Sequence, residues 1–191
     1  METFWFYFDL GFDHVLDIGG LDHFYYLVVL SLPFNFKNWQ KLLWLVSLFT
    51  LGHSLSLLIT HFELIKIDAK WIEFLIPITI CITCLSIIVQ KKPAHLNGFW
   101  INLITLFFGL IHGFGFGRYF KMIATEGEAI LGLLEFALGV EFAQIFIVIF
   151  ILLINGLVVG LLKVQNQKWQ WVISSMVLSQ AILMASANLP F

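Results

Sequence analysis

Ionisable side chains gather in a short stretch that opens the first long apolar segment of the chain. From Gly11 to His23 the sequence reads GFDHVLDIGGLDH and contains His14, Asp17, Asp22 and His23. Imidazole and carboxylate groups bind divalent cations and transfer protons. These residue types predict a metal-binding or proton-handling site, provided that other elements bring matching groups to them.

The composition predicts an integral membrane protein. Of the 191 residues, 60% are hydrophobic and 12% are charged, and the mean hydropathy is +0.95. A soluble protein of this size could not hide so much apolar surface. The formal net charge of −2 provides no basic surface for nucleic acid. We therefore expect a lipid bilayer around the chain and no binding of nucleic acid.

Apolar segments of about 20 residues, long enough to cross the hydrocarbon core, recur between short polar breaks. They predict an all-α, polytopic membrane helix bundle of about six transmembrane helices, forming a single transmembrane domain over residues 1–191. The segments cover residues 14 or 19–33, 41–61, 71–90, 99–117, 129–162 and 169–188. The fifth segment is too long for one perpendicular span. We expect it to bend near Gly139 or to extend beyond the membrane.

The N-terminal residues, METFWFYFDLGF, are aromatic and acidic and lack the positive region of a secretory signal peptide. We expect a short interfacial segment with Trp5 and Tyr7 at headgroup level, and no removable targeting sequence. The positive-inside rule favours placing both termini outside. The cationic residues expected inside are Lys37, Lys41, Lys91, Lys92, Lys163 and Lys168, against Lys66, Lys70, Arg118 and Lys121 outside.

Three histidines on three predicted helices lie at one depth. Counting about 1.5 Å per helical residue from the inner ends places them roughly 18 to 21 Å into the membrane. They are His23, His53 and His112. A charged group at the bilayer centre costs about 2.5–3.5 kcal/mol, so such groups face a cavity or one another. The pattern predicts a shared site in the outer half of the bilayer; a polar network that only holds the helices together is the alternative.

Acidic residues accompany these histidines. By the same count, Glu141 lies at the outer mouth of the fifth helix, with Glu135 beyond it. Neutral imidazole and carboxylate groups suit Ni²⁺, Co²⁺ and Zn²⁺, and the residue types do not select among these ions. Asp22 or Glu141 could instead orient a histidine through its second ring nitrogen. The predicted metal ligands are His14, Asp22, His23, His53, His112 and Glu141, with Asp17, Glu73, Glu135 and Gln144 as secondary candidates.

Other polar residues have simpler explanations. Cys81 and Cys84 lie in the middle of the third segment with no histidine close in sequence, which favours two packed thiols over a redox or zinc site. His95 belongs to an inner turn and is given no role. Three residues are expected in a solvated outer loop: His61, Glu63 and Asp68.

Glycines stand beside the predicted site residues. Gly52 precedes His53, and Gly113 follows His112. Small residues let helices approach closely or let a turn unwind. Packing explains the glycines about as well as function does, but their pairing with histidines favours function.

Four blocks occur in order along most of the chain. They read HVLDIGGLDH at 14–23, FTLGHSL at 49–55, FGLIHGFGF at 108–116 and LGVEFAQ at 138–144. In this order they resemble the HupE/UreJ family of small membrane proteins, in its second, shorter branch. The family's His-x-Asp-His element matches His14, Asp22 and His23. The resemblance implies a permease of the bacterial inner (cytoplasmic) membrane that moves nickel or cobalt inward and is linked to hydrogenase and urease maturation.

The leading hypothesis is therefore a divalent metal-ion permease. A cation would lose water in an outer vestibule built from His14, Asp17 and Asp22 and then engage the deeper histidines and Glu141. The inner half offers few polar groups, so permeation requires a water-filled path or a large alternating movement. These few groups are Ser47, Asn102 and Asn155.

Two alternatives remain open. A membrane-embedded, zinc-type hydrolase would use the histidines to activate a water molecule, with Glu141 or Asp22 as general base. A non-transporting, metal-binding accessory protein would need no path through the inner half. Enzymatic activity is thus a weaker expectation than transport.

Overall fold

The computed structural model describes residues 2–89, 98–124, 127 and 129–191. Within these residues all regular structure is helical, which confirms the all-α expectation for this part of the chain. Lys91, Lys92 and His95 lie outside the described residues. The elements are α1 (Glu2–Leu16), α2 (Asp22–Ser31), α3 (Trp39–His61), α4 (Ala69–Val89), α5 (Phe99–Ile123), α6 (Ala129–Asn155), the π-helix η1 (Gly156–Leu161) and α7 (Asn166–Ala187).

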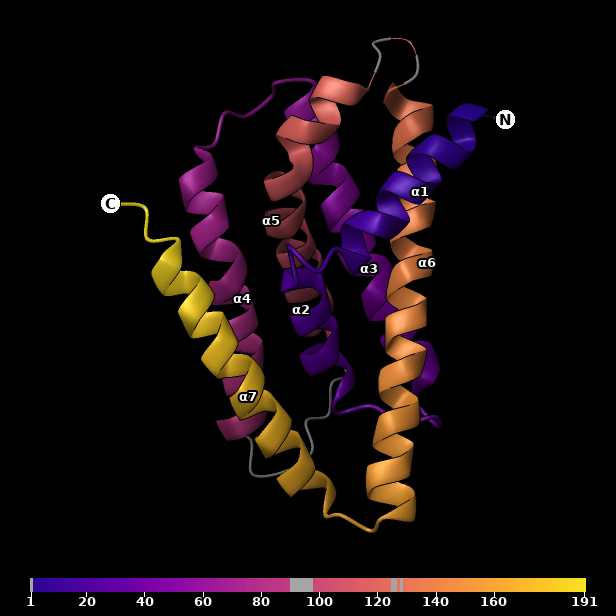
Figure 1. The fold of residues 1–191 in the computed structure, drawn as a ribbon, viewed down its shortest axis with the longest axis vertical. Helices are drawn as coiled ribbons and strands as arrows, with labels where there is room; N and C mark the ends of the chain where they lie inside the picture. The colour runs from indigo at the N-terminus through magenta and orange to yellow at the C-terminus, as the bar shows by residue number, and fades with distance from the viewer. Residues whose placement is uncertain (1, 90–97, 125–126, 128) are drawn as a thin grey trace.

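Five helices are long and apolar enough to cross a membrane: α3, α4, α5, α6 with its extension η1, and α7. The chain is therefore a multi-pass membrane protein in contact with the lipid bilayer. Figure 1 shows these helices upright, with both termini in the upper half of the view. We call the end that carries the α3–α4 connection the upper end and the opposite end the lower end.

The first expected span is divided between two helices. α1 ends at Leu16, and α2 begins at Asp22 and continues downward in Figure 1. The side-chain carboxylate of Asp17 accepts a hydrogen bond from the N–H of Gly19 at 2.8 Å. The backbone carbonyl oxygen of Asp17 accepts one from the N–H of Gly20 at 3.2 Å. A hydrogen bond from an aspartate side chain to a nearby backbone N–H replaces a helical hydrogen bond, so it favours a helix end. The two glycines that follow have a low helix propensity and do not favour continuing the helix. The expected count of six spanning helices is therefore not reproduced by the five long helices.

α1 packs along the upper part of α6. A Cβ added to Gly11 would lie 2.1 Å from the carbonyl oxygen of Phe136, and one added to Gly139 would lie 2.0 Å from that of Phe8. The two backbones therefore touch through one glycine from each helix, and no larger residue fits without a shift. This contact brings the last turn of α1 to the centre of the bundle.

The two aromatic residues expected at headgroup level have different surroundings. Trp5 is 58% exposed, whereas Tyr7 is only 4% exposed. Tyr7 packs against Phe120, with ring centroids 6.2 Å apart, because α1 lies on the bundle and turns this side inward. Tyr7 therefore faces the bundle and not the lipid, while its predicted depth at headgroup level stays a prediction.

α6 runs without interruption through Gly139. The expected bend there is absent, because Gly139 serves the close contact with α1 instead. α6 and η1 together form a span of 33 residues. At about 1.5 Å per residue this is roughly 50 Å, which exceeds a hydrocarbon core of about 30 Å. This length is consistent with the other expectation, that the segment extends beyond the membrane.

α3 and α5 run in the same direction and pack together most extensively. A Cβ on Gly109 would lie 2.1 Å from the carbonyl oxygen of Phe49, and one on Gly52 would lie 2.1 Å from that of Leu106. These distances are shorter than real Cβ contacts, so both positions require glycine. The close approach fixes the register of the two helices and holds His53 and His112 at one level.

Candidate metal centre

Four histidines from four helices meet inside the upper half of the bundle. His14 ends α1, His23 begins α2, and the other two lie within α3 and α5. The ring centroids of His14 and His23 are 4.8 Å apart. The centroid of the His23 ring lies 5.4 Å from that of His53 and 5.5 Å from that of His112. We call these four residues the histidine cluster.

The deep part of the cluster is closed to solvent. His23, His53 and His112 are at most 1% exposed, whereas His14 is half-buried. Phe49 and Tyr26 stack 4.7 Å apart, and both lie within about 5 to 6 Å of His112 by ring centroids. Phe49 precedes His53 by four residues, one helical turn toward the lower end. The two aromatic rings form a floor beneath the cluster.

The ring nitrogens that face the shared space have no hydrogen-bond partner. Among the described residues, Nε2 of His14, His23 and His112 and both ring nitrogens of His53 are buried and unpartnered. A buried polar atom without a partner costs about 1–3 kcal/mol. Several such atoms in one place fit the donor set of a metal ion better than they fit a network that only holds helices together.

Two of the rings are oriented through their other nitrogen. His23 Nδ1 donates to the Asp22 carboxylate at 3.3 Å, and His112 Nδ1 donates to the Phe108 carbonyl oxygen at 2.8 Å. In both rings the remaining Nε2 can then offer a lone pair. A carboxylate or carbonyl behind a histidine is the usual support of a metal ligand.

Three members of the cluster form a group with metal-ligand geometry. One nitrogen from each of His14, His23 and His53 lies within 4.8 Å of the others. Two nitrogens bound at about 2.1 Å to one ion stand at most about 4.2 Å apart. The limit of 4.8 Å exceeds this separation by about 0.6 Å, so an ion would draw the three nitrogens only slightly closer together. Asp22 stands behind His23 rather than inside this group.

An acidic cleft of about 540 Å³ leads to the cluster from the upper end. Its lining includes Asp13, His14, Asp17, Phe116 and Tyr119. The His14 ring lies 4.1 Å from that of Phe116 by centroids and also belongs to the three-histidine group. His14 therefore connects the cleft to the cluster. Asp13 was not among the predicted ligands, although its position beside His14 could have suggested it.

Two polar pairs join α3 and α6 below the cluster. Thr50 Oγ1 donates to Gln144 Oε1 at 2.9 Å, and Ser47 Oγ donates to Glu141 Oε1 at 2.5 Å. Thr50 and Ser47 precede His53 on α3 by one and two turns, which places them about 5 and 9 Å lower. Gln144 is fully buried and Glu141 is half-buried.

Glu141 therefore lies deeper than expected. Phe136 stacks on His53 with ring centroids 6.1 Å apart and marks the level of the cluster on α6. Glu141 follows Phe136 by five residues, toward the lower end. The count from Lys163 placed Glu141 at the outer mouth because it assumed that the whole segment spans the bilayer, whereas η1 reaches further down in Figure 1 than the end of α4.

The remaining candidates lie outside the three-histidine group. Glu73 is exposed on α4, and Glu135, 8% exposed, immediately precedes Phe136 on α6. Both cysteines are free, with Cys84 buried in the core and Cys81 half-buried, which agrees with packed thiols.

Comparison with known proteins identifies the family of this chain. The model described as HupE / UreJ protein matches residues 1–188. The match includes all four sequence blocks and every member of the histidine cluster. No curated protein and no solved structure matches the chain. Because the family match extends over nearly the whole sequence, the chain belongs to the HupE / UreJ family.

Proposed function

We propose that this chain is a divalent metal-ion permease that moves nickel or cobalt inward across a bacterial inner membrane. The observation that carries the proposal is the convergence of unpartnered imidazole nitrogens from four helices inside the helix bundle. The HupE / UreJ family is associated with nickel and cobalt transport, which supports the same conclusion. In this function the ion is the cargo and the chain is not an enzyme.

The acidic cleft is the entrance. Asp13 and Asp17 raise the local concentration of cations, because a cleft lined by one sign of charge attracts the opposite sign. His14 is the first nitrogen ligand that an entering ion meets. With both termini periplasmic, the cleft opens to the periplasm and the residues 1–191 act as one transmembrane domain.

The histidine cluster is the binding site. Neutral imidazole favours nickel, zinc and copper over magnesium and calcium, which prefer oxygen ligands. Asp22 and the Phe108 carbonyl hold two of the rings with Nε2 turned toward the ion. Glu141 provides a second, lower binding site for the ion on its way inward and does not belong to the ligand set of the histidine cluster.

The route out requires movement. The floor of Tyr26 and Phe49 closes the cluster from below. The Thr50–Gln144 pair lies at about the level of Phe49, and the Ser47–Glu141 pair lies lower. Transporters commonly bind cargo where a membrane helix is interrupted and release it when one part rocks against another. The break between α1 and α2 supplies such an interruption directly beside His14 and Asp22.

Uptake in cells tests the permease. Cells that make the protein are given radioactive nickel, and accumulation is compared with cells that make His23→Ala or His61→Ala. We expect accumulation with the unaltered protein and with His61→Ala, because His61 lies outside the cluster at the end of α3. His23→Ala should abolish it. Equal accumulation in His23→Ala cells and unaltered cells would contradict the proposal.

A zinc hydrolase is a second candidate, favoured by the three-histidine group beside an open cleft. Catalytic zinc commonly has three protein ligands and an open position for water. This function predicts no accumulation in cells and a zinc ion that stays bound during chelation. A permease predicts accumulation and rapid exchange of its ion.

A further inference from the structure

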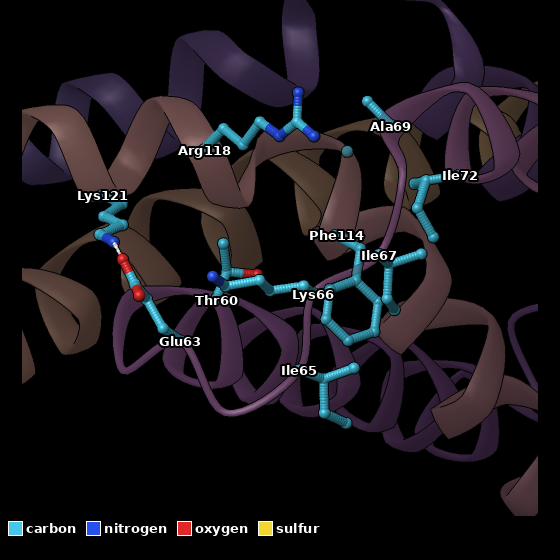
Figure 2. Close-up of a pocket in the computed structure, with 11 residues that line it drawn as sticks. Thr60, Glu63, Ile65, Lys66, Ile67, Ala69, Ile72, Phe114, Arg118 and Lys121 are labelled. Atoms are coloured by element: carbon cyan, nitrogen blue, oxygen red, sulfur yellow. Dashed lines mark hydrogen bonds and ion pairs between the residues drawn. The ribbon is translucent and has the colours of Figure 1, made fainter.

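A second cleft at the upper end lies on another side of α5. It has a volume of about 290 Å³ and lies between α5, the α3–α4 connection at 62–68 and the start of α4 (Figure 2). Phe116 and Tyr119 of α5 line the acidic cleft, whereas Phe114, Gly115 and Arg118 line this one. The two clefts also differ in charge.

Three cationic side chains line the second cleft. They are Lys66, Arg118 and Lys121, and the only acidic residue in the lining is Glu63. Figure 2 shows Lys121 meeting Glu63, and Lys66 extended across the cleft toward Thr60. We call this the basic cleft.

The ion pair leaves positive charge in the basic cleft. The hydrogen bond from Lys121 lowers the pKa of Glu63. The Glu63 carboxylate therefore stays ionised at neutral pH and neutralises the charge of Lys121. Two positive charges then remain, on Lys66 and Arg118. Within the described part of the chain, Arg118 has no hydrogen-bond or ion-pair partner.

The opposite wall of the basic cleft is apolar. Ile67, Ile72 and Phe114 line it (Figure 2). Trp71, at the start of α4, is 48% exposed, and Tyr119, near the end of α5, is 47% exposed. Exposed tryptophan and tyrosine mark the level where headgroups meet the hydrocarbon core. A ligand here meets cations on one side and apolar side chains on the other.

We propose that the basic cleft binds an anionic phospholipid by its headgroup phosphate. Arginine can bind a phosphate through two parallel hydrogen bonds, and lysine adds a second positive charge. The apolar wall of Ile67, Ile72 and Phe114 packs against the glycerol and the first carbons of an acyl chain. A free phosphate ion would use the cations but not this wall, which is the reason for assigning a lipid.

This lipid adds a contact between segments that already pack together through Ile72, Ile76 and Ile111. The cations come from α5 and from the α3–α4 connection, while Ile72 lies on α4. A bound phospholipid therefore fixes the start of α4 to α5. The acidic cleft on α5 remains free for cations, because the phosphate is held elsewhere.

Lipid binding to the purified full chain tests the proposal. The protein in detergent is mixed with phosphatidylglycerol, with phosphatidylcholine or with inorganic phosphate, and bound molecules are counted by native mass spectrometry. The double variant Lys66→Gln/Arg118→Gln removes both unneutralised cations. Lys70→Gln is the matched control, because Lys70 is an exposed cation on α4 outside the lining of the cleft.

We expect one phosphatidylglycerol retained by the unaltered protein and by Lys70→Gln, with phosphatidylcholine retained much less. The double variant should bind phosphatidylglycerol about tenfold or more weakly, as expected when charged hydrogen bonds are lost. Equal retention by the double variant and the unaltered protein would overturn the proposal. Binding of inorganic phosphate without retention of phosphatidylglycerol would also overturn it, since the cleft would then serve a free anion.

Discussion

The side chain of His23 shows, in one residue, the arrangement on which the proposed metal site rests. Asp22 holds its Nδ1, and its Nε2 is buried without a partner. His112 repeats this arrangement with a backbone carbonyl in place of the carboxylate. His53 has no support at either nitrogen. Of these three members of the cluster, two are oriented by a hydrogen bond, and the third would be held only by the ion itself.

Asp22→Asn tests the support behind His23. The amide cannot stabilise the ring as the carboxylate does, so we expect metal affinity to fall about 10- to 100-fold while the fold remains. Competition with a metal indicator in detergent measures the change. Asp68→Asn, in the exposed α3–α4 connection, is the control. Unchanged affinity in Asp22→Asn would remove Asp22 from the site.

His53→Leu tests whether the cluster is kept for binding rather than for stability. Both of its buried ring nitrogens lack a partner, so replacing the ring with an apolar side chain removes a cost of about 1–3 kcal/mol per atom. We expect the metal-free variant to melt at least a few degrees higher than the metal-free unaltered protein, and to bind metal poorly. A lower Tm together with full metal binding would contradict this account.

At the element scale, the cluster depends on how α3 and α5 approach each other. Glycines let the two backbones come within contact distance, and the register that results sets His53 beside His112. The interruption after α1 has a similar role, since it lets His14 end one helix while His23 begins the next. Helix geometry thus brings together residues that are 98 positions apart in the sequence, His14 and His112.

Gly109→Ala tests this helix contact. The new Cβ would lie 2.1 Å from the Phe49 carbonyl oxygen, so the helices must separate. We expect a loss of about 1–3 kcal/mol in stability and weaker metal binding, because overpacking forces the backbone to shift. Gly160→Ala, where a Cβ meets nothing within 4 Å, should leave both unchanged. Thermal unfolding in detergent and metal titration provide the readouts.

The sequence predicted the meeting of the histidines because depth can be counted along straight helices. α3 and α5 begin close to their predicted starts and run parallel, so His53 and His112 fall where the 1.5 Å rise puts them. The same count failed for Glu141, because it cannot show how far a long helix extends beyond the bilayer. It also missed the contact of α1 with α6, which depends on side-chain packing between distant segments.

At the scale of the whole molecule, acidic and basic side chains line separate clefts on two sides of α5. The acidic cleft leads to the histidine cluster, and the basic cleft lies on another side of the same helix. Below the cluster come an aromatic floor and two polar pairs between α3 and α6. The order from entrance to binding site to closed floor supports the proposed transport by alternating access. The Thr50–Gln144 pair lies near the level of the floor, and the Ser47–Glu141 pair lies below it.

Glu141→Gln separates binding from transport. Glu141 lies below the floor and pairs with Ser47, so its charge is not needed to load the cluster but is available to a cation that has passed it. We expect unchanged metal content in the purified variant and at least tenfold slower accumulation in cells. Glu73→Gln, an exposed carboxylate on α4, is the control. Loss of bound metal in Glu141→Gln would instead make it part of the first site.

The central claim is that the histidine cluster holds a metal ion, and metal content of the purified protein tests it most directly. The unaltered protein, His61→Ala and the triple variant His23→Ala/His53→Ala/His112→Ala would be loaded with nickel or cobalt, desalted and measured by elemental analysis. We predict about one ion per chain in the first two and none in the triple variant. Equal metal in the folded triple variant, or none in any sample after loading, would contradict the account.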